Sequence, residues 1–594
     1  MVGRTHGRLH QKAIYIALGL VMLATLLVRV YNIARFPNLN TAFDPWIHIQ
    51  VAEVLINSGH IDMEYHGGNF ALHIILAYLK LLLGTSLLSI AKYSPIIFGT
   101  VATLSFVIFT QKLTKSYPIA LITGILLGLV ADRFVFATGQ TWPEILGLIF
   151  MGFILYSWTE SLSTKSIKKS SFSFVFFIVL MFSHRLSVLI FILFLIPASI
   201  ALLIWQKQNI ISLLFTAFSI GSWYLWITNV DLEFYQLIDK MIGRITRVTR
   251  IFPGFPIIVI VVGIIGIGLL MGLFLLVRHQ YILDSFEEIN PDTRIIALWA
   301  LSLALLSYLI IEIVSSPLGA QYFGTATSTQ LLLKVGSKVF IFLLSFLGLF
   351  YLLKHFRTWQ SVFLVVWIVI FLVILSLLTF LPSLGGAGYD IFRFIAYMYL
   401  PLCISSAIGI YYIFKVDNLS LQKTLAVICI IFIVFVIPIG ATSAFMTAEQ
   451  GAYTQNWLDA QDYATLEWME GNLDRHSIVL ADKRYYFGFT SMLDPENSQI
   501  VIYSEGEHLQ LYYNITNQNI AKKFIRQLHF NGEWHEFYVL VDSTMLDYGL
   551  LYNHHLYRPL TMDEYDEYFH VVYFELVYYS KDIALFHFVR SRFN

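Results

Sequence analysis

Long apolar runs separated by short polar segments dominate the first three quarters of the chain. Many of these runs approach the roughly 20 residues that an α-helix needs to cross a bilayer. The pattern predicts a polytopic α-helical membrane protein with about 13 transmembrane helices, at 13–32, 88–110, 118–131, 143–158, 172–183, 186–204, 210–228, 254–277, 295–313, 337–353, 361–380, 393–413 and 424–443.

The pattern changes after residue 443. The remaining sequence has no run long enough to span a bilayer, and helix-like stretches (457–472 and 520–529) alternate with strand-like ones (478–480, 499–503, 536–541, 570–579 and 583–589). We therefore expect a transmembrane module at 1–443, with a large first outer loop at 33–87, and a soluble C-terminal α/β domain at 444–594.

Composition supports a membrane protein and excludes several other classes. Of the 594 residues, 57% are hydrophobic and 13% charged, whereas soluble domains carry roughly 25% charged residues. A cytosolic enzyme and a nucleic-acid binder are excluded on this ground. The two cysteines, Cys403 and Cys429, both lie in apolar stretches, so a disulfide-stapled secreted scaffold is excluded as well.

Charge predicts the orientation. When the spans alternate sides from a cytoplasmic N-terminus, the basic short loops fall on the cytoplasmic side, as the positive-inside rule requires; they contain Lys112, Lys115, Lys165, Lys168, Lys169, Lys207, Arg278, Lys354, Arg357, Lys415 and Lys423. The segment 13–31 is expected to be a retained first span and not a cleaved signal peptide. An odd number of spans then places the acidic C-terminal domain outside the cytoplasm.

The first outer loop contains the most informative motif, Asp-Pro-Trp-x-His, which begins at Asp44. Asp44 before a proline fits a helix cap, and His48 would lie one turn later on the same face. This motif directly follows the first span and resembles the first-loop acidic motif of the catalytic subunit of archaeal and eukaryotic oligosaccharyltransferases, and more broadly of GT-C superfamily membrane glycosyltransferases.

The resemblance extends to the layout of spans, first loop and outer C-terminal domain. It implies a GT-C type fold, a lipid-linked sugar donor in the membrane, and a catalytic role for Asp44 as a base or as a ligand to a divalent metal such as Mg or Mn, with His48 a further candidate ligand. The family has a second acidic motif, after the third span, and residues 131–144 would correspond to it. Here the paired acidic motif is missing, so either Glu144 or Asp132 would act singly. For Glu144, a helix-start carboxylate is the alternative.

Two groups of basic residues could bind the donor phosphate. Lys240, Arg244, Arg247 and Arg250 are spaced to form one helical stripe in an outer loop, although an interfacial helix that contacts lipid head groups is the alternative. Arg393, at the outer mouth of the twelfth span, resembles the family's phosphate-contacting arginine, and arginine binds phosphate oxygens bidentately. Asp390 could instead pair with it.

Histidines near the predicted outer face are weaker candidates. His184 and Arg185 separate two apolar runs, and such residues can serve only as interface anchors. His66 and His73 could face the same cavity as His184, but the sequence gives little support for a metal role.

The C-terminal domain departs from the resembled family. It lacks the Trp-Trp-Asp-Tyr-Gly motif that reads a peptide acceptor, and the equivalent segment runs from Ala481 to Gly488, with Tyr485 and Trp468 as candidate acceptor-stacking residues. The family's Thr-Ile-x-Glu element would fall near 315–330, which contains no acidic residue.

These departures favour a glycosyltransferase that moves sugar from a polyprenyl-phosphate donor to a glycan or lipid-linked saccharide at the extracytoplasmic face. Protein N-glycosylation by an oligosaccharyltransferase is the alternative. A non-enzymatic polytopic receptor or scaffold, which would not need Asp44, comes next, and a transporter last. The predicted partners are the lipid-linked donor, membrane lipids and a glycan or protein acceptor, with no nucleic acid.

Overall fold

The computed structural model is mostly helical and is described in two compact units. One unit comprises residues 1–31, 61–72 and 94–445, and the other comprises 32–60, 73–93 and 446–594. The structure describes residues 2–35, 44–60, 69–206, 210–232, 235–236, 341–349, 351–352, 359–380, 388–414, 423, 460–474, 477–482, 485, 501–503, 509–513, 517, 519, 536–547, 550–552, 555–556, 558–580, 583–589 and 592.

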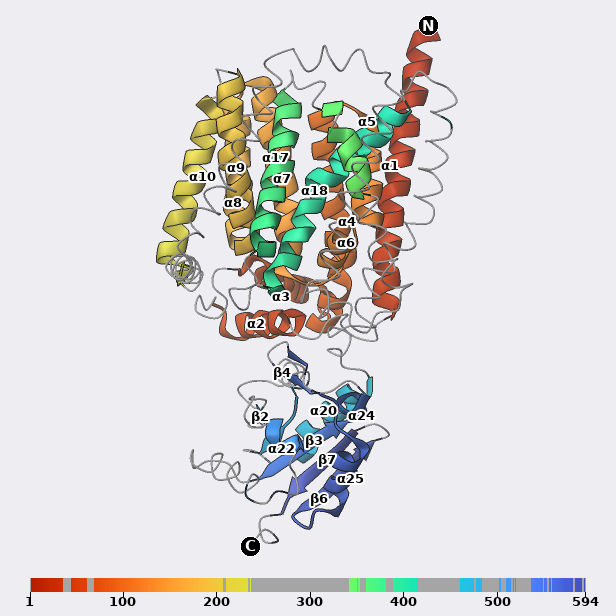
Figure 1. Cartoon of the computed structure of the whole chain (residues 1–594), viewed down its shortest axis with the longest axis vertical. Helices are drawn as coiled ribbons and strands as arrows, with labels where there is room; N and C mark the ends of the chain where they lie inside the picture. The colour runs from red at the N-terminus through yellow and green to blue at the C-terminus, as the bar shows by residue number, and fades with distance from the viewer. Residues whose placement is uncertain are drawn as a thin grey trace. The chain divides into compact units, whose positions relative to one another are not determined.

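Nine of the predicted spans correspond to described helices (Figure 1). They are α1 (Val2–Arg35), α4 (Leu87–Thr114), α5 (Tyr117–Ile125) with the π-helical turn η1 (Leu126–Val130), α7 (Pro143–Thr164), α8 (Ile167–Ser183), α9 (Arg185–Gln206), α10 (Ile210–Asn229), α17 (Trp359–Phe380) and α18 (Gly388–Ile413).

Five described helical stretches are long and apolar enough to cross a membrane by length and composition: 12–31, 87–114, 143–164, 185–202 and 394–413. Residues 341–349 of the predicted span 337–353 are helical. The predicted spans 254–277, 295–313 and 424–443 lie outside the described residues.

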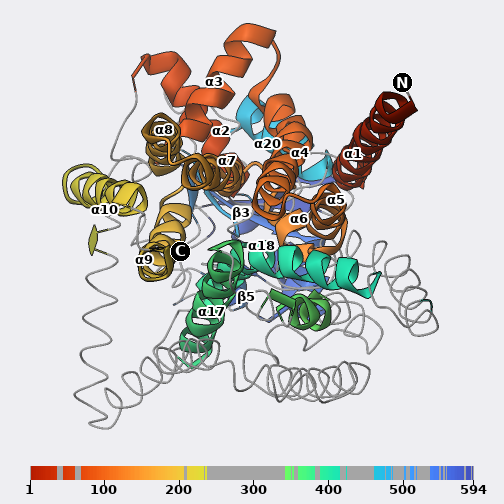
Figure 2. The same ribbon diagram turned by 90° about the horizontal axis from the view of Figure 1, so that it is seen from above.

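Helix α1 lies at the edge of its unit, on the opposite side from α10, in both views (Figures 1 and 2). Its apolar side chains Leu20, Leu23 and Leu27 are exposed, while Thr25 and Arg29, one turn apart, are buried. A helix with this distribution presents apolar residues to lipid and polar residues to the protein, the reverse of a helix in a water-soluble protein.

Close helix packing in this unit depends on small residues. A Cβ added at Gly147 of α7 would lie 2.1 Å from Ser187 Oγ of α9, and one at Gly152 would lie 2.1 Å from Ser105 Oγ of α4. Membrane helices associate through such small residues because lipid gives no hydrophobic force between helices.

The acidic corner at 131–142 differs from the expected outer loop. It forms a short helix, α6 (Asp132–Ala137), and nearly every residue from Ala131 to Gln140 is buried. The π-helical turn η1 closes on it through a hydrogen bond from Ala131 N to Leu126 O of 2.8 Å. Such turns widen a helix locally and occur frequently at functional sites.

The other unit contains α2 (Asp44–Ser58) and α3 (Ala71–Leu83), of which residues from His73 onward belong to it. Two side-chain pairs join these helices: His48 with His73, and Glu53 with Lys80, whose Oε1 and Nζ are 2.5 Å apart.

A five-stranded mixed sheet with the order β2-β1-β3-β7-β6 forms from the C-terminal sequence. The strands are β1 (Ile478–Leu480), β2 (Val501–Tyr503), β3 (Phe537–Asp542), β6 (Phe574–Ser580) and β7 (Ile583–Phe588), and a separate pair is formed by β4 (Leu551–Tyr552) and β5 (His555–Leu556). β1 pairs in parallel with β2 and β3, whereas β7 is antiparallel to β3 and β6. All five sheet strands lie in or overlap the stretches that the sequence predicts.

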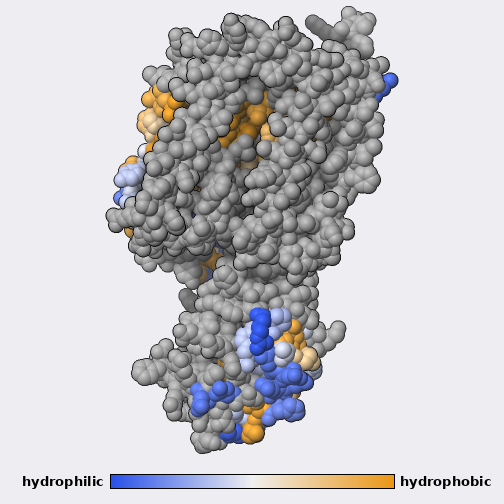
Figure 3. Space-filling model, viewed as in Figure 1, coloured by the Kyte–Doolittle hydropathy of each residue, from blue (hydrophilic) through white to orange (hydrophobic). Residues whose placement is uncertain are grey.

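Among the described C-terminal residues, short or medium helices accompany this sheet: α20 (Ala460–Asn472), α22 (Leu509–Tyr513), α24 (Ser543–Asp547) and α25 (Met562–His570). Over these C-terminal residues, Figure 3 shows hydrophilic and hydrophobic surface side by side. Accordingly, α25 is acidic in its first turn but exposes Met562 and Phe569. The predicted domain boundary between 443 and 444 stays a prediction.

Candidate functional site

Helix α18 takes part in one cluster of buried polar side chains with α6 and in another with α9. Tyr399 Oη of α18 donates to Asp132 Oδ1 of α6 at 2.8 Å, and both side chains are buried. This bond uses one oxygen of Asp132, one of the two predicted acidic residues of the corner. Asp132 is therefore held inside the helical unit by α18 and does not face outward as a loop residue would.

The second cluster joins α9 to α18 through His184, Ser187 and Tyr397. Ser187 Oγ lies 2.7 Å from His184 Nδ1 and is also hydrogen-bonded to Tyr397 Oη. Tyr397 Oη is in turn 3.3 Å from His184 Nδ1. All three side chains are buried, with His184 6% exposed, so this histidine is more than the interface anchor that the sequence left as an alternative.

Local folding explains the position of His184. Its backbone is extended, with φ −161° and ψ 110°, and it directly precedes α9. Ser187 N, three residues later, donates to His184 Nδ1 at 3.3 Å. The imidazole thus replaces the Ser, Thr, Asp or Asn side chain that usually accepts a hydrogen bond from the first turn of a helix.

Glu144 lies in the first turn of α7 and is buried, 3% exposed. Gly147, one turn later, packs against the His184 cluster, because a Cβ added there would lie 3.1 Å from His184 Cβ. Residues three apart share a helix face. The structure therefore brings the Glu144 face of α7 to the same junction as His184.

Arg393 lies on α18, one helical turn before Tyr397. The helix includes Arg393 and Tyr397, and four residues make one turn, about 5–6 Å along the axis. The side chain of Arg393 lies outside the described atoms, as do Lys240, Arg244, Arg247 and Arg250 entirely. Their roles in phosphate binding stay predictions.

Asp44 is the first residue of α2, as the predicted helix start requires, but its side chain is also outside the described atoms. His48, one turn later, is buried, and its Nδ1 is 2.8 Å from His73 Nε2. Two imidazoles at this distance share one hydrogen. When His48 Nδ1 donates, the lone pair of its Nε2 is the one suited to a metal ion, since ligating histidines usually donate their other N–H to a neighbour.

Asp44 and His48 would supply two of the ligands that a divalent cation needs. An aspartate and a histidine one turn apart offer an oxygen and a nitrogen ligand. Within the described side chains no group of three His, Cys, Asp or Glu residues could hold a metal ion. A metal bound by Asp44 and His48 therefore stays a prediction.

The two predicted acceptor residues take different positions in the other unit. Tyr485 is fully buried and donates to Asp542 Oδ2 at 2.9 Å, with a second hydrogen bond to Asp462. Trp468 of α20 packs against Tyr578 of β6, with ring centroids 4.6 Å apart. Tyr485 thus forms part of the interior of this domain, and the acceptor role of both residues stays a prediction.

Arg29 is a buried charged residue of the helical unit that the sequence reasoning missed. Arg29 of α1 is 1% exposed and donates to Thr138 Oγ1 at 2.5 Å and to Thr25 O at 3.0 Å. Its Nε lies against Gly99 of α4. An arginine near the end of an apolar run reads as an interface anchor in a sequence, whereas here it connects α1, α4 and the corner after α6.

Neither the known protein families nor the curated proteins include a match to this sequence. Among solved structures, the chain is similar to ArnT from Cupriavidus metallidurans in the apo state, with a TM-score of 0.38 and 8% identity over 98% of this chain and 99% of that one. It is also similar to the arabinofuranosyltransferase AftD from Mycobacteria, with a TM-score of 0.49 and 10% identity over 96% of this chain and 40% of that one. At these values the likenesses establish neither the activity nor the substrates of this chain.

Proposed function

We propose that this protein is an integral membrane glycosyltransferase of the GT-C type, which transfers a sugar from a polyprenyl-phosphate or polyprenyl-diphosphate donor at the extracytoplasmic membrane face. The observation that carries the proposal is the burial of hydrogen-bonded polar side chains between α18 and both α6 and α9, and of Glu144 in the first turn of α7, within a helical unit rich in apolar spans. Buried ionisable groups are costly in a membrane protein, and they mark functional sites there.

In the proposed reaction, Asp44 removes the proton from the acceptor hydroxyl, and Glu144 is the other carboxylate for which the sequence predicts a catalytic role. The acceptor oxygen forms the new bond to the anomeric carbon, while the bond from that carbon to the donor phosphate oxygen breaks and its electron pair stays on the phosphate. Arg393 and the basic stripe at 240–250 stabilise the phosphate charge.

A divalent metal at Asp44 and His48, when bound, would supply positive charge for the phosphate oxygens. Asp44 would then serve as its ligand. The buried hydrogen bond between His48 and His73 orients the imidazole in either case.

Asp44→Asn is the test of this function. Asparagine caps a helix about as well as aspartate, so a structural Asp44 would tolerate the change. A base or metal ligand would lose transfer by a factor on the order of 100 or more. The assay uses purified protein, a polyprenyl-phosphate-linked sugar and a lipid-linked saccharide acceptor, and normal transfer by a folded Asp44→Asn protein contradicts the assignment.

The choice between saccharide and peptide acceptors rests on what the sequence lacks. An enzyme selects an Asn-x-Ser/Thr peptide when groups in its binding site would lose their partners with any other acceptor. The paired tryptophans that would supply such groups are absent from 481–488. We therefore favour a glycan acceptor. A sequon peptide supplied in parallel decides the matter, because its glycosylation, lost when Ser or Thr becomes Ala, would identify an oligosaccharyltransferase.

A further inference from the structure

The ends of α4 and α7 carry basic residues that the proposed reaction does not use. Gly152 of α7 packs on Ser105 of α4. About two turns later on both helices, Glu160 of α7 pairs with Lys112 of α4. The two helices therefore run in the same direction and end at the same level. The turns that follow them bring several lysines to one end of the helical unit.

We define the lysine cluster by the five residues Lys112, Lys115, Lys165, Lys168 and Lys169. Glu160 pairs with two of them, Lys112 and Lys169. Lys115 and Lys169 also lie close enough to Lys112 to repel its charge. Together with Glu160, the five lysines carry an excess of four positive charges. The C-terminal ends of α4 and α7 offset only about half a charge each, so the cluster stays strongly cationic.

Two of these lysines have a backbone conformation that usually belongs to glycine. Lys115 has φ 55° and Lys165 has φ 51°, and each directly follows the last residue of a helix. At the same place after α2 and α3 the chain has Gly59 and Gly84. A residue with a Cβ is strained in this left-handed region. The turns therefore do not explain the choice of lysine, and strain held at a defined position is typical of functional residues.

Helix α8 connects the lysine cluster to a surface that faces lipid. Lys168, Phe172 and Val175 are exposed and are spaced to share one face of the helix. On another face, Ser173 Oγ donates to Ser157 Oγ of α7 at 2.9 Å, so α8 lies along a helix that is long and apolar enough to cross the membrane. Lys168 thus lies one turn beyond apolar residues that face acyl chains, at the level where a lysine meets lipid head groups.

We propose that the lysine cluster binds an anionic phospholipid of the bilayer. Lys115 and Lys168, both exposed, contact the phosphate of the head group, and the acyl chains lie on Phe172 and Val175. A soluble anion would use the charges alone, whereas a phospholipid uses the charges and the adjoining apolar face. The binding is non-covalent, and the inference does not depend on the proposed function.

Lys115→Gly separates this role from a role in the turn, because glycine suits the left-handed conformation and removes the charge. A lysine that served only the turn would be replaced by glycine without loss. Lys168→Gln removes a second charge at an exposed position, and Lys168→Arg keeps that charge. The matched control is Lys423→Gln, which removes an exposed lysine that is not part of the lysine cluster.

The measurement is native mass spectrometry of the purified full-length protein in detergent, titrated with phosphatidylglycerol or with phosphatidylcholine of the same acyl chains. We expect Lys115→Gly and Lys168→Gln each to weaken phosphatidylglycerol binding about fivefold and to leave phosphatidylcholine binding unchanged. Lys168→Arg and Lys423→Gln should bind both lipids as the wild type does. In detergent without added lipid, all four variants should unfold near the wild-type temperature.

Three results would overturn the proposal. One is phosphatidylglycerol binding that Lys115→Gly and Lys168→Gln leave unchanged, or that Lys423→Gln weakens equally, since net charge and not the lysine cluster would then decide it. Another is displacement of the lipid by inorganic phosphate at the same concentration, which would identify a site for soluble anions. The third is tighter binding of a polyprenyl phosphate than of phosphatidylglycerol, weakened by the same two variants, which would assign the lysine cluster to that lipid.

Discussion

At the scale of single residues, the sequence identified ionisable side chains but not their surroundings. Glu144 was expected at the start of a span and lies there. Its burial beside the His184 junction could not be predicted, because that junction unites residues more than 200 positions apart, as in the bond between Ser187 and Tyr397. Hydrogen bonds of this range leave no periodic signal in a sequence.

Gly99 gives a prediction at this scale. A Cβ added there would lie 2.0 Å from Arg29 Nε and 2.3 Å from Thr138 O. We expect Gly99→Ala to force Arg29 away from Thr138 and to destabilise the folded protein by about 1–3 kcal/mol, seen as a lower unfolding temperature in detergent. The control is Gly221→Ala in α10, where nothing lies within 4 Å. Equal stability of the two variants would contradict the packing.

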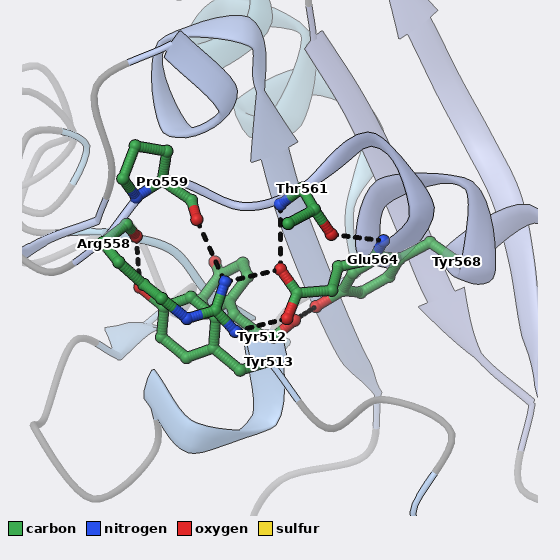
Figure 4. Close-up of polar contacts among 7 residues, drawn as sticks. All are labelled: Tyr512, Tyr513, Arg558, Pro559, Thr561, Glu564 and Tyr568. Carbon is green, nitrogen blue, oxygen red and sulfur yellow. Dashed lines mark hydrogen bonds and ion pairs between the residues drawn. The ribbon is translucent and has the colours of Figure 1, made fainter.

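The pair of Arg558 and Glu564 gives a pH-dependent prediction (Figure 4). Hydrogen bonding to Arg558 lowers the pKa of Glu564 below its ordinary value, and a backbone hydrogen bond from Thr561 lowers it further. A lowered folded-state pKa contributes stability above the ordinary pKa of glutamate, near 4.3, and that stability is lost as the pH falls through the folded-state value.

Glu564→Gln isolates this charge effect, because glutamine also fits the capping box that Thr561 and Glu564 form at the start of α25. We expect the variant to be less stable than the wild type from about pH 5 to pH 7, and the difference to become smaller as the pH falls below the ordinary pKa of glutamate. Amide hydrogen exchange of α25 across this pH range is the measurement. A difference that persists unchanged at pH 3 would exclude the carboxylate as its source.

At the scale of elements, apolar runs predicted helices well, since length and hydropathy determine a span almost alone. The ends were less predictable: α7 extends to Thr164, beyond the predicted 158, and α8 begins at Ile167 in place of 172. Both differences lie at a charged turn, where Glu160 pairs with Lys112 and Lys169. These ion pairs allow charged residues to continue a helix past the end of its apolar run.

Tyr485 gives a prediction about how elements are joined. Its hydroxyl bonds to Asp462 of α20 and to Asp542 at the end of β3. Tyr485→Phe leaves these buried carboxylates without that donor, so we expect a loss of about 1–3 kcal/mol in the stability of the domain. Tyr579→Phe, in a side chain 58% exposed, is the control. Unchanged stability together with altered acceptor preference would support acceptor contact in place of this structural role.

At the scale of the whole molecule, the sequence predicts an orientation that follows from charge alone. Lys168 belongs to the basic segment 159–171, which the positive-inside rule places in the cytoplasm. The C-terminal residues, with 21 acidic and 10 basic side chains after residue 443, are expected on the opposite side. The site at the ends of α7 and α18 would then face away from the cytoplasm, as a polyprenyl-linked donor on that face requires.

Cysteine labelling in sealed vesicles tests this orientation. In a protein with Cys403 and Cys429 replaced by Ala, we expect Lys168→Cys to react only with a membrane-impermeant maleimide on the cytoplasmic side and Met562→Cys only with one on the outer side. Both native side chains are exposed, so a failure to react reflects the membrane and not burial. Reaction of Lys168→Cys from the outer side would reverse the topology, move the mouth of α7 to the cytoplasmic face, and remove the basis for an extracytoplasmic transfer reaction.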